Sequence, residues 1–156
     1  MNLIDYLHYY IGSNVLLCKN LEGNNVIEPV TAKMLHEDIE AFTDDLKPYR
    51  LLLRRLEDMT RDDMKPIYAH IFSKPFPDSG RIVWLGKEER TAAKRFVMMS
   101  GVDRVGIEMT GYIWADCDLS HVKFNPHLIA HYLLRQHFDL FNLIDNNLAV
   151  DIKSIQ

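Results

Sequence analysis

The sequence lacks the short motifs by which several common enzyme classes are recognised. Its 7 glycines are scattered, and none of the patterns GxGxxG, GxxxxGK[ST] and GxSxG occurs. Nucleotide binding through a glycine-rich loop therefore has no support. The two cysteines, Cys18 and Cys117, carry no local signature of a catalytic cysteine. We lean towards a protein that is not an enzyme, and we expect no cofactor.

Long apolar runs are also missing. No stretch approaches the ~20 consecutive apolar residues that a membrane span requires. The N-terminal segment MNLIDYLHYYIG has no positively charged start, and Asp5 and His8 interrupt its apolar residues, so it does not match a signal peptide. Two isolated cysteines are typical of reduced cytoplasmic proteins, although a disulfide between them stays open. We expect a cytoplasmic protein without a membrane segment.

Charge is unevenly distributed along the chain. The net charge is −4. Residues 1–45 carry 2 Lys/Arg against 8 Asp/Glu (net −6), residues 46–104 carry 13 against 8 (net +5), and residues 105–156 carry 3 against 6 (net −3). The middle of the chain is thus the candidate basic surface. Because a nucleic-acid domain usually has a strongly basic total, a mixed and solvated face is the alternative that we favour.

The chain contains 156 residues, of which 47% are apolar and 26% charged. This composition favours one globular domain that needs no metal or disulfide for stability. Alternation or short apolar runs predict strands at residues 14–20, 26–30, 49–56 (with a helix as the alternative), 81–85, 104–109 and 111–118. Helical spacing and capping residues predict helices at residues 2–10, 32–44, 60–72, 87–99 and 125–148. We therefore expect a single α+β domain over residues 1–156, with a mainly antiparallel sheet of about five or six short strands and four or five helices packed on it.

The helix starts carry the clearest local signals. Thr60 offers a capping hydroxyl, and Asp62 and Asp63 follow it in the first turn. Asn125 is a second capping residue, and Pro126 takes the first helical position, where proline is tolerated best. Residues 149–153 either end the last helix or add an edge strand. The apolar spacing of residues 133–148 predicts a buried face that fixes the end of the chain to the core.

One cluster of residues has the chemistry of a zinc site. The spacing C-x3-H-x5-H-x3-H places a thiol and three imidazoles close together along the chain, as Cys117, His121, His127 and His131. The helix lacks the glutamate of a metalloprotease, and packing of the cysteine beside surface histidines explains the same residues. Asp116 and Asp118 are a second, common pair of carboxylates that suits a divalent cation or simply ends a strand.

The central basic segment supplies the candidate contacts for a partner or a nucleic acid. Its cationic side chains suit phosphates, and a tryptophan is available for stacking. The candidate residues are Arg54, Arg55, Trp84, Lys87, Arg90, Lys94 and Arg95. The alternative is that these cations pair with neighbouring carboxylates such as Glu57, Asp58 and Glu88, which the interleaved signs favour.

Three segments together resemble a known group of proteins. They are MNLIDYLHYYIG at the start, YRLLLRRLEDMTRDDM in the middle and NPHLIAHYLLRQHFDLFNLIDNNLAVD at the end. In this order they resemble small uncharacterised proteins of Bacteroidetes phages and prophages. The resemblance covers about half of the chain, and Asn147 stands where those proteins tend to have glycine. Residues 75–118 have no counterpart in them, so this segment is a candidate family-specific insertion.

The resemblance implies a setting and carries no known activity. It implies a small, soluble protein of a mobile element, working in a bacterial cytoplasm. Proteins of this kind without enzyme motifs often bind and block a host machine. We therefore expect a protein that binds and inhibits or modulates a host protein or ribonucleoprotein, such as an anti-defence or anti-CRISPR inhibitor. The alternatives are a nucleic-acid-binding accessory protein that uses the central basic segment and, last, a metal-dependent enzyme.

Overall fold

A computed structural model describes residues 4–12, 14–18, 25–33, 49–85, 95–108 and 111–155. The contacts divide the chain into two compact units. The first unit combines Met1–Arg55 with Leu133–Gln156, and the second unit is Leu56–Tyr132. The predictions of a single domain and of an insertion at residues 75–118 stay predictions.

The first unit is built on a four-stranded sheet with the order β2-β1-β3-β9. The strands are β1 (Asn14–Cys18), β2 (Asn25–Pro29), β3 (Tyr49–Leu53) and β9 (Ala149–Asp151). β1 pairs antiparallel with β2 and β3, whereas β9 pairs parallel with β3. Short helices complete the described part of this unit, α1 (Ile4–Leu7), η1 (His8–Tyr10) and η4 (Ile152–Ile155). Pro29 lies in the edge strand β2, as expected for a residue that lacks an amide donor.

The core of the first unit forms where the middle and the end of the chain meet. Leu51, Leu52 and Leu53 are each at most 1% exposed, so β3 is covered on both faces, as the apolar run predicted. The backbone of Arg54 continues this contact, because its amide donates to the carbonyl of His137 and its carbonyl accepts from the amide of Asp139. The last segment contributes further buried side chains, Phe138, Leu140, Leu143, Ile144 and Ala149.

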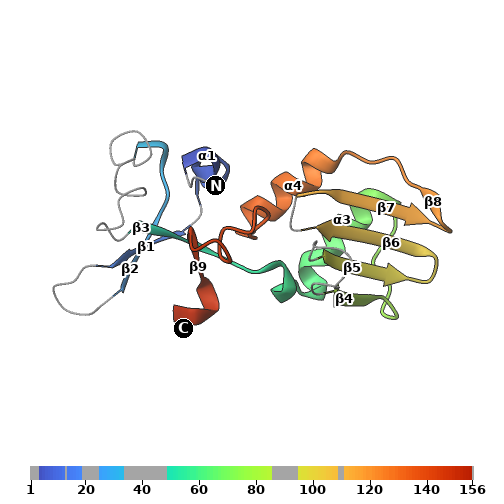
Figure 1. Cartoon of the computed structure of the whole chain (residues 1–156). Helices are drawn as coiled ribbons and strands as arrows, with labels where there is room; N and C mark the ends of the chain where they lie inside the picture. Colours follow the sequence, from blue (N-terminus) through green and yellow to red (C-terminus); the bar gives the residue numbers. More distant parts are fainter. Residues whose placement is uncertain are drawn as a thin grey trace. The chain divides into compact units, whose positions relative to one another are not determined.

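The second unit contains a five-stranded antiparallel sheet with the order β4-β5-β6-β7-β8. The strands are β4 (Arg81–Leu85), β5 (Arg95–Ser100), β6 (Asp103–Glu108), β7 (Ile113–Cys117) and β8 (Ser120–His121). The unit also holds η3 (Leu56–Asp58), the helix α3 (Arg61–Phe72) and most of α4 (Pro126–Arg135). Figure 1 shows α3, in green, behind this sheet.

α3 starts where the sequence predicts. The hydroxyl of Thr60 accepts from the amide of Asp63, and the carboxylate of Asp63 accepts from the amide of Thr60, so the capping box is complete. α3 ends at Ser73, whose φ is 56°. The buried stripe of this helix is Met64, Ile67, Tyr68 and Ile71.

Two helix predictions are wrong. Residues 95–99 lie in β5, where the buried Met98 pairs with Ile82 and Val105, so tertiary pairing overrides the local helical spacing. The last helix also ends at Arg135 instead of reaching residue 148, because the chain turns at His137, with a φ of 65°. Residues 87–94 and most of the predicted helix 32–44 lie outside the described residues.

The coarse fold class is confirmed, since helices and a five-stranded antiparallel sheet are both present. The finer expectation needs correction. The described residues form two sheets instead of one, and three α-helices instead of four or five. No helix in the described ranges is both long and apolar enough to cross a membrane.

Candidate functional site

The inward face of the five-stranded sheet contains a polar cluster around Asp103. Asp103 is 2% exposed, accepts a hydrogen bond from the hydroxyl of Tyr68, and lies 2.7 Å from the amine of Lys74. The thiol of Cys117, across the β6–β7 pair, also hydrogen bonds to this carboxylate. Because Tyr68 belongs to α3, this row of β6 side chains faces that helix.

The charges in this cluster are arranged for stability. Burial disfavours the ionised carboxylate, but hydrogen bonds from Lys74, Tyr68 and Cys117 outweigh burial and hold the pKa of Asp103 below its usual value. The hydrogen bond to Asp103, with burial, raises the pKa of the Cys117 thiol, and the same carboxylate raises the pKa of Lys74. A nucleophilic thiol or amine needs the opposite shift. The cluster is thus a poor nucleophilic site.

The outward face of the same sheet holds an ordered aromatic ring. Trp114 pairs with Gly106 across β6 and β7. A Cβ placed on Gly106 would lie 2.1–2.3 Å from the Cε2, Cζ2 and Nε1 atoms of the indole, so the ring lies on the glycine. Gly106 is buried, whereas Arg104 and Glu108 on the same face of β6 are half-buried. The indole therefore covers the sheet at a position where only glycine fits.

A row of charged side chains crosses the outward face beside Trp114. The register aligns one residue from each strand, in the order Arg81, Met99, Arg104, Asp116 and His121. The guanidinium of Arg104 lies 3.2 Å from the carboxylate of Asp116. The amide of Val122 donates to the carbonyl of Ala115, which continues the pairing past β8 and brings Lys123 opposite Trp114.

The β7–β8 hairpin ends in an unusual turn. Asp118 and Leu119 have φ values of 49° and 62°, the left-handed values of a two-residue type I′ turn. The side chain of Leu119 is nevertheless 80% exposed. The amide of Asp118 donates to the carbonyl of Val102, and the side chain of Val102 is 55% exposed. An apolar tip, formed by Val102 and Leu119, thus lies at one end of the sheet.

A pocket of about 280 Å³ lies between α3 and α4. Its lining is mainly apolar, namely Pro66, Ile67, His70, Leu128, Ile129 and Tyr132. The hydroxyl of Tyr132 already donates to the carbonyl of Asp63. The imidazole of His70 is therefore the main reactive group among the residues that line this pocket.

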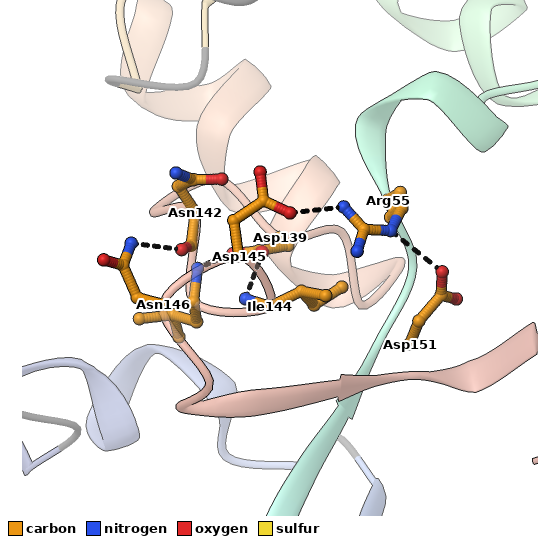
Figure 2. Close-up of polar contacts among 8 residues, drawn as sticks. Arg55, Asp139, Asn142, Ile144, Asp145, Asn146 and Asp151 are labelled. Atoms are coloured by element: carbon orange, nitrogen blue, oxygen red, sulfur yellow. Dashed lines mark hydrogen bonds and ion pairs between the residues drawn. The ribbon is translucent and has the colours of Figure 1, made fainter. Parts of the chain in front are cut away.

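The predicted basic residues of the first unit serve its own fold. The guanidinium of Arg55 lies 2.7 Å from Asp145 and 3.0 Å from Asp151. It thus joins the last loop to β9, and Figure 2 draws both contacts. The Arg54 guanidinium lies over the Phe138 ring, 4.2 Å from its centroid. Arg55 thus pairs with carboxylates 90 and 96 residues away in the sequence, and the pairing of basic residues with neighbouring carboxylates stays a prediction.

A buried carboxylate organises the same loop. The carboxylate of Asp139 accepts from the amides of Leu143 and Ile144 at 2.8 and 2.9 Å, and the second of these bonds is drawn in Figure 2. Burial raises the pKa of Asp139, although these amides oppose the shift. The side-chain amide of Asn146 donates to the carbonyl of Asn142 and closes the turn.

The remaining predicted partner-binding residues are divided. Trp84 lies two residues after Ile82 on β4, and Ile82 pairs with the buried Met98. Trp84 therefore lies on the inward face that α3 covers. Lys87, Arg90 and Lys94 lie outside the described residues, as does the side chain of Arg95, although its backbone pairs with Glu108 in β5 and β6. Sequence reasoning thus selected the inward tryptophan and missed Trp114. The alternation in RVGIE and YIWAD puts Gly106 and Trp114 among the outward residues of their strands, but only the register places them opposite each other.

The predicted zinc ligands are not brought together as a group. The thiol of Cys117 hydrogen bonds to Asp103 on the inward face, whereas the side chains of His121, His127 and His131 are exposed. In the part of the chain that the structure describes, no three His, Cys, Asp or Glu side chains form a group suited to a metal ion. The backbone amide of His127 donates to the side chain of Asn125, which confirms the predicted helix cap.

Comparisons with protein-family models, curated proteins and solved structures give no match to this chain. The resemblance to phage proteins therefore stays an expectation from the sequence.

Proposed function

We propose that this chain is a non-catalytic binding protein, and that it contacts a protein partner through the apolar tip of Val102 and Leu119. The partner class that we propose is a host protein or ribonucleoprotein in a bacterial cytoplasm, with inhibition of a defence system as one form of the activity. The phage-like sequence segments motivate this choice of partner.

The conformation and exposure of Leu119 carry this proposal. A left-handed backbone costs a residue with a Cβ about 1–2 kcal/mol, and asparagine and glycine are the usual residues in such turns. An exposed leucine also forgoes the ~1.5–3 kcal/mol that burial of its side chain contributes. Folding alone thus favours another residue at this position. A partner pocket that buries Leu119 explains its presence.

The polar cluster around Asp103 supports a binding role over a catalytic one. The pKa values of Cys117 and Lys74 are both raised, so both groups stay protonated at neutral pH. The pKa of Asp103 is held below its usual value, and its Oδ2 atom already contacts Tyr68 and Lys74. This arrangement ties β6, β7 and α3 together and supplies a rigid base for the hairpin.

Leu119→Gly tests the proposal with two readouts. The variant restores a preferred residue to the turn, so its thermal midpoint should equal or exceed that of the wild type. Affinity capture from a bacterial host lysate, followed by mass spectrometry, should lose the proteins that the wild type retains.

Ile27→Thr is the matched control, because Ile27 is 50% exposed in β2 of the first unit and threonine keeps the preference for a strand. It should leave the captured proteins unchanged. Equal capture by the wild type and Leu119→Gly would contradict the proposal, as would a wild type that captures nothing.

A further inference from the structure

We infer that the outward face of the five-stranded sheet binds single-stranded nucleic acid, with a base stacked on Trp114 and phosphates held by Arg81, Arg104 and Lys123. This site is separate from the apolar tip in its residues and in its chemistry. It uses none of the candidate binding residues that the sequence suggested, although Arg81 and Arg104 lie within the basic segment of residues 46–104.

The side chain of Trp114 is held in a position that suits stacking. One face of its indole lies against Gly106, so the opposite face is directed away from the sheet. The backbone contact holds the ring flat, and the side chain loses little further freedom when a base stacks on it. Stacking suits any base, since each has a flat π-surface, and it does not require a specific hydrogen-bond pattern.

The outward face also carries cationic side chains that suit phosphates. The described cations are Arg81, Arg104 and Lys123, against the carboxylates of Asp116 and Glu108, while His121 adds a titratable imidazole. The bond from Arg104 to Asp116 uses one N–H of the five in a guanidinium, so donors remain for a phosphate oxygen. Lys123 is exposed, and the backbone pairing of Val122 with Ala115 places it opposite Trp114.

The width of the outward face matches a short strand. The row from Arg81 to His121 crosses five strands, and neighbouring strands lie about 4.8 Å apart, so it spans about 19 Å. A base that stacks on Trp114 is separated from its neighbours, so the strand lies extended across the face and a few nucleotides fit there. The face therefore suits a short single strand.

A single strand fits this face better than a duplex or a protein does. The bases of a duplex stack on one another and cannot present a face to Trp114. The core of a protein interface is usually depleted in charge, whereas charged groups from three strands surround this ring. Met99, which is 38% exposed, is the apolar member of the row.

The experiment measures fluorescence anisotropy of labelled 12-nucleotide oligothymidylate and oligouridylate, titrated with the full chain at low salt. Trp114→Ala should weaken binding about 5- to 150-fold through the lost stacking. Trp114→Phe should retain most of the affinity, which guards against a fold defect in the alanine variant. Trp84→Phe is the matched control on the inward face and should bind as the wild type does.

Salt dependence separates the phosphate contacts from stacking. Three neutralised phosphates predict a slope of about −2 in a plot of log K against log salt, and Arg104→Gln should reduce its magnitude by about 0.7. Leu119→Gly should leave oligonucleotide binding unchanged, so this test and that of the protein partner fail independently. Absence of binding by the wild type, equal affinity of Trp114→Ala, or equal affinity for a duplex of the same length would overturn the inference.

Discussion

Replacing Phe138 with alanine tests whether the end of the chain is part of the core of the first unit. The Phe138 side chain is 0% exposed, its carbonyl accepts from the hydroxyl of Tyr10 at 3.3 Å, and the guanidinium of Arg54 covers its ring. Truncation of a buried phenylalanine to alanine removes about 3–5 kcal/mol from the free energy of unfolding. This is a large part of the 5–15 kcal/mol typical of a folded protein.

The assay is urea unfolding of the full chain, followed by far-UV circular dichroism and by tryptophan fluorescence. Both tryptophans, Trp84 and Trp114, belong to the second unit, so their fluorescence reports on that unit. With a urea slope of about 1–3 kcal/mol per molar, the dichroism midpoint of Phe138→Ala should fall by on the order of 2 M.

A single cooperative domain predicts that the fluorescence midpoint falls in step, whereas independent units predict that it stays fixed. Phe138→Leu is the control that keeps an apolar side chain, and it should lose less than half as much stability. A free energy of unfolding within about 1 kcal/mol of the wild type for Phe138→Ala would refute the reasoning.

Three further predictions concern the C-terminal segment, the start of α3 and the polar cluster around Asp103. Truncation after Arg135 removes β9 and several buried side chains worth ~1.5–3 kcal/mol each, so it should unfold the first unit; a cooperatively folded truncate would show that the segment docks elsewhere. Asp63→Ala breaks the capping box of α3 and should lower the stability seen by tryptophan fluorescence by about 1 kcal/mol, and an unchanged midpoint would contradict this. Because the pKa of Asp103 is lowered, its ionised form stabilises the second unit at every pH above its usual pKa, and the stabilisation is lost as the pH falls through the lowered value. Asp103→Asn should therefore flatten the acid limb of the stability curve, and an acid limb like that of the wild type would count against the assignment.

The sequence predicted those elements whose signals are local. The capping residues Thr60 and Asn125 mark helix starts because their side chains bond to amides two or three residues away. The run Leu51–Leu53 predicted burial on both faces, since three successive leucines leave neither side of a strand polar. In each case a few adjacent residues determine the outcome.

Local signals were insufficient where distant pairing decides the structure. Residues 95–100 contain apolar residues that suit either a helix or a strand, and pairing with β4 and β6 selects the strand. The turn after Arg135 has neither glycine nor proline, so the positive φ of His137 had no marker. The candidate site depends on the same long-range information, because Trp84 and Trp114 are assigned to opposite faces only once the register is known.

The connectivity of the two units has a consequence for the order of events during synthesis. All strands of the second unit come from the continuous segment Leu56–Tyr132, so a nascent chain can complete this unit as soon as that segment has left the ribosome. The first unit must wait, because β3 acquires its parallel neighbour β9 only after more than 90 intervening residues have been added, from Arg54 to Leu148. Before β9 is added, one edge of β3 is unpaired, and its leucines, which are buried in the folded unit, are accessible to chaperones and proteases. The segment Leu133–Gln156 therefore completes the first unit only after all strands of the second unit have been synthesised.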